Sequence, residues 1–245
     1  MKSTAIYLLP NTLTTMGLFS GFLAILASLD GHFISAVYCI IVAMLLDALD
    51  GRVARMTGTE SEFGKEFDSL ADMVSFGVSP ALVMYSWCYN SFGEIGYAVS
   101  FLYVAAVALR LAKFNTQVQE KNSFKGLPSP AGAATLICLV WFAEVYSLNS
   151  FYFSVIALSI GVLVAILMVS NIPYYSFKAV DLTQRISWVN CFLIVIFFFL
   201  FVIAPALVFF LMFMTYLISG LLSYFVPQQN FFQKLKPYLK HKSGS

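Results

Sequence analysis

Residues 47–72 read DALDGRVARMTGTESEFGKEFDSLAD, with aspartates at positions 47, 50, 68 and 72. Residues three or four apart share one face of a helix, so Asp47 with Asp50, and Asp68 with Asp72, each form an edge of two carboxylates. We expect the two edges to lie on the facing ends of two consecutive helices. Two such edges would form a cluster of four acids, in a chain that is otherwise mostly hydrophobic.

The composition of the whole chain indicates an integral membrane protein. Of its 245 residues, 60% are hydrophobic and 11% are charged, whereas about 25% are charged in an ordinary soluble domain. Folding in water as a single globule is therefore not expected. The formal net charge of +2 is too small to indicate nucleic-acid binding, so we expect no nucleic acid among the partners.

Apolar stretches predict where the chain crosses the membrane, since about 20 apolar residues cross the roughly 30 Å hydrocarbon core. Six spans are expected, at about 3–29, 32–50, 68–88, 95–115, 130–146 and 152–170. As one helix, the uncharged stretch 186–233 would reach about 72 Å, so it must double back. Ala204-Pro205 is the expected break, because proline lacks the amide that continues a helix. The sequence thus predicts an all-α polytopic bundle of about eight transmembrane helices.

With eight spans, the basic residues fall on one side of the membrane. All fourteen Lys and Arg residues lie in the loops and tails of that side, whereas the opposite loops carry Asp30, Glu94 and Glu144. The positive-inside rule then places both termini and the aspartate-bearing loop in the cytoplasm. We expect a protein of the cytoplasmic (inner) membrane whose acidic site faces the cytoplasm.

The four clustered carboxylates need cations, because unneutralised charges this close would repel one another or take up protons. Mg²⁺ and Mn²⁺ prefer oxygen ligands and also suit phosphate substrates. We therefore expect a site for Mg²⁺ or Mn²⁺, and for two ions on charge grounds, made by Asp47, Asp50, Asp68 and Asp72. The alternative is a structural salt-bridge cluster with the two neighbouring arginines, although two bases cannot neutralise four acids.

Small residues leave room beside the acids. Gly51 and Ala54 remove side-chain bulk from the aspartate face of the earlier helix, and Gly64 does the same on the later one. Arg52 and Arg55 can meet anionic oxygens. We therefore expect a flat or phosphorylated group against this surface. For each glycine taken singly, a helix break near the membrane interface is an equally good explanation.

The pattern DxxDGxxAR, eight residues, then GxxxDxxxD resembles the signature of the CDP-alcohol phosphotransferase family, and this chain matches every fixed position. The resemblance implies a membrane enzyme that displaces CMP from a CDP-linked donor with an alcohol hydroxyl, at a divalent-metal site formed by the signature aspartates. It implies that Asp72 is the general base. It also implies that the CDP-lipid contacts Gly51, Arg52, Ala54, Arg55, Gly64 and Asp68.

Four further segments are similar to the branch of that family that makes phosphatidylserine: residues 63–81, 110–115, 126–133 and 170–178. This similarity implies transfer of the phosphatidyl group from CDP-diacylglycerol to the hydroxyl of L-serine, by direct displacement of CMP. Since it extends from about Leu9 to Lys178, we expect a catalytic core of six spans at 1–178. Two additional transmembrane helices at 179–233 and a basic cytoplasmic tail at 234–245 would follow. The resemblance alone implies a homodimer among membrane lipids.

Free serine carries a carboxylate, and basic side chains on the expected cytoplasmic side are candidates for holding it or a substrate phosphate. Arg110 is favoured because its guanidinium fork can pair two oxygens. Lys113 and Lys125 are further candidates, although the positive-inside rule also accounts for lysines here. Asn115 and Ser129 could supply neutral hydrogen bonds.

Other interpretations remain open from the residues alone. The acceptor could be glycerol 3-phosphate, an inositol phosphate or choline, and intramembrane aspartates could line the path of a cation transporter. Against a transporter, all four aspartates lie close to the cytoplasmic ends of their predicted spans. A covalent phosphatidyl-histidine route is excluded, because His32 lies in an opposite loop and His241 lies in the tail.

Overall fold

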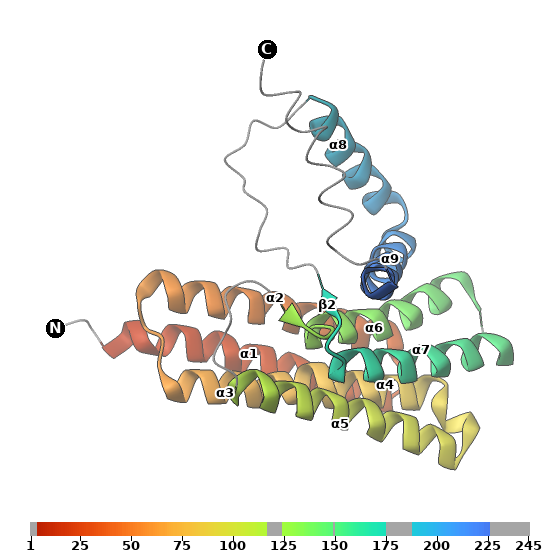
Figure 1. The fold of residues 1–245 in the computed structure, drawn as a ribbon, viewed down its shortest axis with the longest axis horizontal. Coiled ribbons are helices and arrows are strands. Elements are labelled where there is room, and N and C mark those ends of the chain that lie inside the picture. Colours follow the sequence, from red (N-terminus) through yellow and green to blue (C-terminus); the bar gives the residue numbers. More distant parts are fainter. Residues whose placement is uncertain (1–3, 117–123, 149, 175–187, 226–245) are drawn as a thin grey trace.

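The structure is a computed structural model that describes residues 4–116, 124–148, 150–174 and 188–225. Within these ranges the chain is helical apart from two short strands, β1 (Phe124–Lys125) and β2 (Pro173–Tyr174), which pair in antiparallel fashion. Figure 1 shows α1 to α7 lying alongside one another as a single bundle. The predicted all-α membrane fold is confirmed.

The helices follow one another through short connections where the chain is described. Their bounds are α1 (Thr4–Leu29), α2 (Phe33–Thr57), α3 (Glu62–Asp72), the π-helix η1 (Met73–Val78), α4 (Ser79–Trp87), the 3₁₀-helix η2 (Tyr89–Phe92), α5 (Glu94–Thr116), α6 (Ser129–Tyr146), α7 (Phe151–Val169), α8 (Trp188–Ile203) and α9 (Pro205–Phe225). The segments α3, η1 and α4 form one continuous helix.

Seven stretches of the described chain are long and apolar enough to cross a membrane: Leu9–Leu29, Phe33–Thr57, Glu62–Trp87, Glu94–Thr116, Ser129–Tyr146, Phe151–Val169 and Pro205–Leu222. Each contains or overlaps one of the predicted spans. The remaining predicted span falls on α8, which has 16 described residues. A helix of that length reaches about 24 Å, which is short of the roughly 30 Å hydrocarbon core.

The second and third spans extend further toward each other than the charge pattern predicted. The second was expected to end near Asp50 but α2 continues to Thr57, and the third was expected to begin at Asp68 but α3 begins at Glu62. A helix need not stop where the hydrocarbon core stops, so a charge-free run marks the span and not the helix. Both halves of the aspartate motif are therefore helical.

Two local signals make the sharp turn between these helices. Gly58 ends α2 in the left-handed conformation, with φ of 62°, and its N–H bonds back to the Arg55 carbonyl. The side chain of Ser61 then starts α3 by accepting a hydrogen bond of 3.0 Å from the Gly64 N–H. The turn brings the two acidic segments face to face.

The third span contains a π-helical segment directly after Asp72. A π turn disturbs the regular backbone bonding, and such segments often occur at functional sites. Tyr103 of α5 is buried and donates a hydrogen bond of 2.8 Å to the Phe76 carbonyl inside this segment. The Ser79 hydroxyl lies 2.7 Å from the Gly21 carbonyl of α1 and so ties the end of the π segment to the first helix. Neighbouring helices therefore hold the irregular backbone in place.

The first helix approaches the π segment very closely at Gly21. A Cβ atom added there would lie 2.6 Å from the Ser75 hydroxyl oxygen and 2.8 Å from the Ser75 Cα atom. Small residues permit such close approach between membrane helices. The helix that carries Asp68 and Asp72 is thereby fixed against α1.

The core of the bundle centres on α6, which packs against α2, α4, α7 and α9. Most of α6 is buried, including Leu136, Ile137, Leu139 and Val140. The strand β1 leads into α6 and β2 follows α7, so the β1–β2 pair lies at the end of the bundle where α6 begins. This end also holds the close of α2 and the start of α3.

The break predicted at Ala204-Pro205 is confirmed, because α8 ends at Ile203 and α9 begins at Pro205. Figure 1 shows α8 standing away from the bundle while α9 lies close to α6. Most α8 side chains that the structure describes are exposed and apolar, as suits contact with lipid. The expected boundary at residue 178 and the basic tail at 234–245 lie outside the described residues.

Candidate active site

The α2–α3 turn brings three of the four signature aspartates together. Oxygen atoms of Asp47, Asp50 and Asp68 all lie within 4.8 Å of one another. Asp47 and Asp50 come from the last turns of α2, and Asp68 comes from α3. The expectation of facing carboxylate edges on consecutive helices therefore agrees with the geometry for these three residues.

Asp50 is the most enclosed of the three, with 4% of its surface exposed. The Thr14 hydroxyl of α1 donates a hydrogen bond of 2.7 Å to the Asp50 Oδ2 atom. A hydroxyl held against one carboxylate oxygen fixes the rotamer of the acid and leaves its other oxygen for a ligand. Thr14 is thus part of the site, and the sequence analysis did not identify it.

Asp72 lies beside this group, one helical turn beyond Asp68 and directly before the π segment. It lines the same recess as the other three acids and interacts electrostatically with Asp47, Asp68 and Arg110. Of the four acids, Asp72 is the one that interacts electrostatically with Arg110 of α5 among the described contacts. This position separates it from the three-oxygen group while keeping it within the same site.

The recess between α1, α2 and the third span is narrow, with a cavity volume of about 10 Å³. Its walls come from three helices and include all four aspartates together with Thr14, Gly17, Ser75 and Phe76. A cavity of this size has room for about one water-sized group or ion, so a nucleotide must lie mainly outside it, over the helix ends.

The donor set fits a hard divalent cation. Mg²⁺ binds oxygen ligands at about 2.0–2.1 Å in octahedral geometry, so the ligand atoms around one ion lie about 3 to 4 Å apart. Three carboxylate oxygens within 4.8 Å of one another approach that spacing without any movement of the helices. The oxygen-only ligands favour Mg²⁺ or Mn²⁺ over softer metals.

The residues expected at the CDP-lipid lie on the outer side of the acidic group. Arg52 and Arg55 are exposed, and the Arg55 guanidinium lies over Gly51, where an added Cβ would be 3.5 Å from the Nη1 atom. Ala54 is half-buried one turn further along α2. Since only a mobile arginine end covers Gly51, the structure leaves space for a ligand at this surface.

Gly64 lies across from this surface, at the start of α3. An added Cβ there would be 3.1 Å from the Ser61 hydroxyl and 3.4 Å from the Asn11 Oδ1 atom of α1. The Asn11 carboxamide therefore borders the candidate CDP surface, and it too was missed by the sequence analysis. Asn11 and Thr14 are three residues apart on α1, so one face of the first helix serves the site.

Only two of the five residues expected at serine contact each other in the described part of the chain. Arg110 and Ser129 come together near Asp72, with the Arg110 Nη1 atom donating a hydrogen bond of 2.7 Å to the Ser129 hydroxyl. Lys113 donates to the Asn171 Oδ1 atom at 2.8 Å. Lys125 lies in β1, but its side chain is outside what the structure describes.

Asn115 lies in a different place from the other candidates. Its amide donates a hydrogen bond of 3.0 Å to the Ser69 hydroxyl of α3, on the outer part of the bundle end. Because Ser69 follows Asp68 directly, this contact ties the end of α5 to the helix that carries two of the acids. Asn115 therefore helps to hold α3 in place. Arg110, which bonds Ser129, is the candidate that interacts with Asp72.

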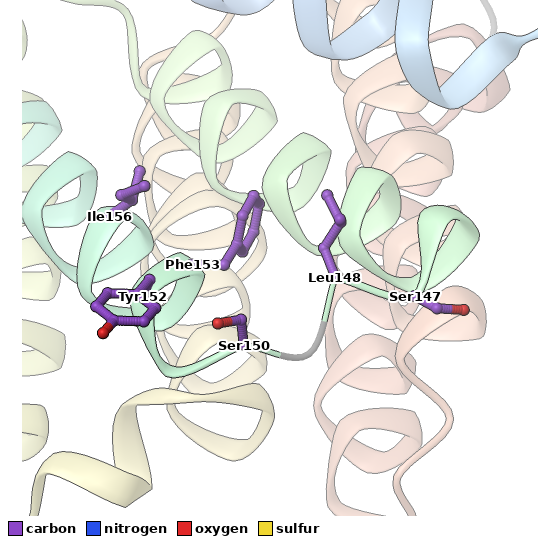
Figure 2. Close-up of a pocket in the computed structure, with 6 residues that line it drawn as sticks. All are labelled: Ser147, Leu148, Ser150, Tyr152, Phe153 and Ile156. Atoms are coloured by element: carbon purple, nitrogen blue, oxygen red, sulfur yellow. The ribbon is translucent and has the colours of Figure 1, made fainter.

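A larger hollow of about 480 Å³ lies at the opposite end of the bundle, at the turn between α6 and α7. Figure 2 shows its six lining residues, which are Ser147, Leu148, Ser150, Tyr152, Phe153 and Ile156. None of these side chains is charged, so this hollow lacks the acids and bases that phosphoryl chemistry requires. The acidic recess is the better candidate despite its smaller size.

Comparisons with known proteins identify the family. Residues 7–167 match the family model described as CDP-alcohol phosphatidyltransferase. A CDP-diacylglycerol–serine O-phosphatidyltransferase from Helicobacter pylori (strain ATCC 700392 / 26695) is 42% identical over 182 residues, which cover 74% of this chain and 77% of the relative. A protein of the same name from Mycobacterium leprae (strain TN) is 33% identical over 224 residues, covering 88% and 74%.

An archaetidylserine synthase from Methanothermobacter thermautotrophicus (strain ATCC 29096 / DSM 1053 / JCM 10044 / NBRC 100330 / Delta H) is 39% identical over 175 residues, covering 71% of this chain and 72% of the relative. The family match spans more than half of the chain and contains the four aspartates, Arg110 and Ser129. The aspartates that lie close together in the structure are therefore within the residues that match the family model. This chain belongs to the CDP-alcohol phosphatidyltransferase family.

Proposed function

We propose that this protein is a CDP-diacylglycerol–serine O-phosphatidyltransferase, which moves the phosphatidyl group of CDP-diacylglycerol to the hydroxyl of L-serine. The observation that carries the proposal is the gathering of Asp47, Asp50 and Asp68 oxygens within 4.8 Å, beside Asp72 and Arg110. The names of the Helicobacter and Mycobacterium relatives support serine as the acceptor. The products are phosphatidylserine and CMP.

The four aspartates are the proposed metal ligands, for Mg²⁺ or Mn²⁺ and for two ions on charge grounds. A divalent ion held there supplies positive charge to the pyrophosphate of the donor and to the departing CMP. The protein contributes by fixing the ligands. Thr14 orients Asp50 through its hydrogen bond, and the tight α2–α3 turn holds Asp68 opposite Asp47.

Asp72 is the proposed general base. The serine hydroxyl attacks the β-phosphorus that carries the lipid, so a new O–P bond forms as the bond to CMP breaks and the hydroxyl proton passes to Asp72. An aliphatic hydroxyl is hardly ionised at neutral pH, so a positioned base contributes about 10² to 10⁴-fold. Arg110 interacts electrostatically with Asp72 and is the proposed group that holds the anionic end of the acceptor.

The lipid substrate accounts for the membrane setting. Its CDP head would lie over Gly51, Arg52, Ala54, Arg55, Gly64 and Asp68, while its acyl chains remain in the bilayer. The positive-inside rule supports a site that faces the cytoplasm, where serine can enter from water. We also propose a homodimer, which rests on the family resemblance.

The test is CMP release by the purified full-length protein. It is given CDP-diacylglycerol with Mg²⁺ or Mn²⁺ and, in separate reactions, serine, glycerol 3-phosphate, an inositol phosphate or choline. We expect release that depends on serine and stops when EDTA removes the metal. Release with another acceptor in place of serine would reassign the acceptor, and release without any acceptor would contradict the transferase reaction.

A matched pair of variants separates the site from the rest of the protein. Asp68→Asn removes one proposed metal ligand and should abolish serine-dependent release. Asp30→Asn makes the same chemical change at an exposed residue in the α1–α2 turn, at the other end of the bundle, and should leave release unchanged. Equal activity of the two variants would contradict the proposed metal site.

A further inference from the structure

The last described helix, α9, lies outside the family match at 7–167 yet packs against the catalytic core. Phe209 meets Trp141 of α6 with ring centroids 5.7 Å apart, and Tyr216 meets Tyr174 of β2 at 5.4 Å. Leu217 is buried on the same side of the helix. A helix that served only as a membrane anchor would not need these contacts with α6 and β2. We therefore count α9 as part of the folded core.

The contact between α9 and β2 depends on a glycine. A Cβ atom at Gly220 would overlap the Tyr174 ring, so only glycine permits this approach. Tyr174 is 5% exposed, and its hydroxyl has no hydrogen-bond partner among the described residues. Buried polar groups are nearly always paired in folded proteins, so an unpaired hydroxyl at this position points to a ligand.

The same layer reaches the proposed acceptor site through Arg110. The Tyr216 hydroxyl group interacts electrostatically with Arg110, which also interacts with Asp72. The Arg110 Nη1 atom donates to Ser129, but its Nε atom is buried and has no hydrogen-bond partner among the described residues. Arg110 therefore interacts both with Asp72 of the third span and with Tyr216 of α9.

An anionic group satisfies these requirements. The Arg110 Nε atom and the Tyr174 hydroxyl are donors that need acceptors, and guanidinium groups and tyrosine hydroxyls both bind carboxylates well. In serine, the carboxylate and the reacting CH₂OH group are bonded to the same carbon atom. A carboxylate held by Arg110 would thus keep the hydroxyl near Asp72.

We propose that α9 forms one wall of the acceptor pocket, and that Tyr216 and Arg110 together bind the carboxylate of the amino acid acceptor, with Tyr174 beside them. This inference rests on the proposed function, because it assumes an amino acid acceptor. It adds a selectivity element from outside the family match. The Tyr216 hydroxyl should therefore not strengthen the binding of acceptors that lack a carboxylate.

The experiment compares Tyr216→Phe with the wild-type protein in the CMP-release assay. Phenylalanine keeps the ring contact with Tyr174 and removes only the hydroxyl. We expect the KM for serine to rise about tenfold or more, as for loss of a hydrogen bond to a charged group. The KM for CDP-diacylglycerol should stay within about twofold, and so should the inhibition constant of serinol, which lacks the carboxylate.

Two further variants complete the experiment. Tyr152→Phe removes an exposed hydroxyl at the opposite end of the bundle and should change neither KM. Tyr174→Phe tests the same wall independently, should Tyr216→Phe fail to fold as judged by its melting curve in detergent. We expect Tyr174→Phe also to raise the KM for serine while sparing the KM for CDP-diacylglycerol.

The outcomes separate this inference from the function on which it rests. If the wild-type protein shows no serine-dependent release, both fail together. If release depends on serine but folded Tyr216→Phe and Tyr174→Phe proteins keep the wild-type KM for serine, the role of α9 is wrong and the function stands. An equal rise in the KM for both substrates, or in the serinol constant, would also overturn the carboxylate assignment.

Discussion

At the scale of single residues, replacing Asp72 by asparagine tests whether this residue is the general base. Asp72→Asn keeps the size and polarity of the side chain but cannot accept the serine proton. We expect CMP release to fall about 10² to 10⁴-fold, because that is the usual contribution of a positioned base. Equilibrium binding of CDP-diacylglycerol should remain, since Asp47, Asp50 and Asp68 still form their group. Near-normal turnover would rule out the role of Asp72 as base.

Thr14 gives a second test at this scale, through its hydrogen bond to Asp50. Thr14→Val keeps the shape of the side chain and removes the hydroxyl, so Asp50 loses the group that orients it. We expect the metal concentration for half-maximal activity to rise about 10 to 100-fold, which is typical for loss of a partner of a metal ligand. Thr14→Ser should retain the wild-type value.

The matched control for Thr14 is its neighbour Thr15. Thr15 is exposed and bonds only locally, to the Asn11 carbonyl at 2.7 Å. Thr15→Val should leave the metal requirement unchanged, as measured by titrating Mg²⁺ and Mn²⁺ in the CMP-release assay. A similar shift in both variants would mean that the effect comes from helix α1 in general and not from Asp50.

The acids could be predicted from the sequence, whereas their partner on α1 could not. Spacings of three and four residues place carboxylates on one helix face without knowledge of the tertiary structure. Three threonines occur close together at positions 12, 14 and 15. Which of them faces Asp50 depends on how α1 is rotated against α2, and an almost uniformly apolar helix carries no periodic signal for that rotation.

At the scale of helices, the contact between α1 and the π segment holds the acid-bearing helix in position. Gly21→Ala would place a Cβ against the Ser75 side chain and backbone at less than 3 Å. We expect a loss of stability of about 1–3 kcal/mol, typical of overpacking, because neither backbone can move freely. The midpoint of thermal unfolding in detergent measures the loss, and CMP release should fall as Asp72 shifts.

Gly17, one turn earlier on α1, is the control for this prediction. A Cβ there would make ordinary contacts of 3.6 Å with Leu46 and 3.7 Å with the Ala43 carbonyl. Gly17→Ala should therefore leave the midpoint of thermal unfolding close to that of the wild-type protein. If Gly21→Ala were equally well tolerated, the close approach of α1 to the π segment would not be a requirement of the fold.

The helices differ in how well their sequence predicts them. Pro205 gave the break between α8 and α9 correctly, because proline acts on the backbone locally. The π segment at Met73–Val78 has no comparable local signal. Its freed carbonyl is satisfied by Tyr103, which lies 27 positions away from Phe76 in the chain, so only the packed bundle reveals it.

At the scale of the whole molecule, the polar chemistry is confined to one end of an apolar bundle. The acids of α2 and α3, Arg110 of α5 and Ser129 of α6 meet there, and α9 reaches the same end through Tyr216. The centre of α6 is buried and apolar.

This separation of the two ends predicts the orientation of the protein in the membrane. The end with the acids carries many basic residues, whereas the turns at the other end carry acidic ones. By the positive-inside rule, the acidic site should face the cytoplasm. Glu60 in the α2–α3 turn and Ser150 at the start of α7 are both exposed and mark the two ends.

Single cysteines at these two positions, in a protein whose four native cysteines are replaced, give the measurement. A thiol reagent that cannot cross membranes should label Glu60→Cys in inverted vesicles but not in intact cells. The same reagent should label Ser150→Cys in intact cells. Labelling of both after detergent treatment controls for reactivity. Labelling of Glu60→Cys from outside the cell would place the active site on the far side, where serine from the cytoplasm cannot reach Asp72.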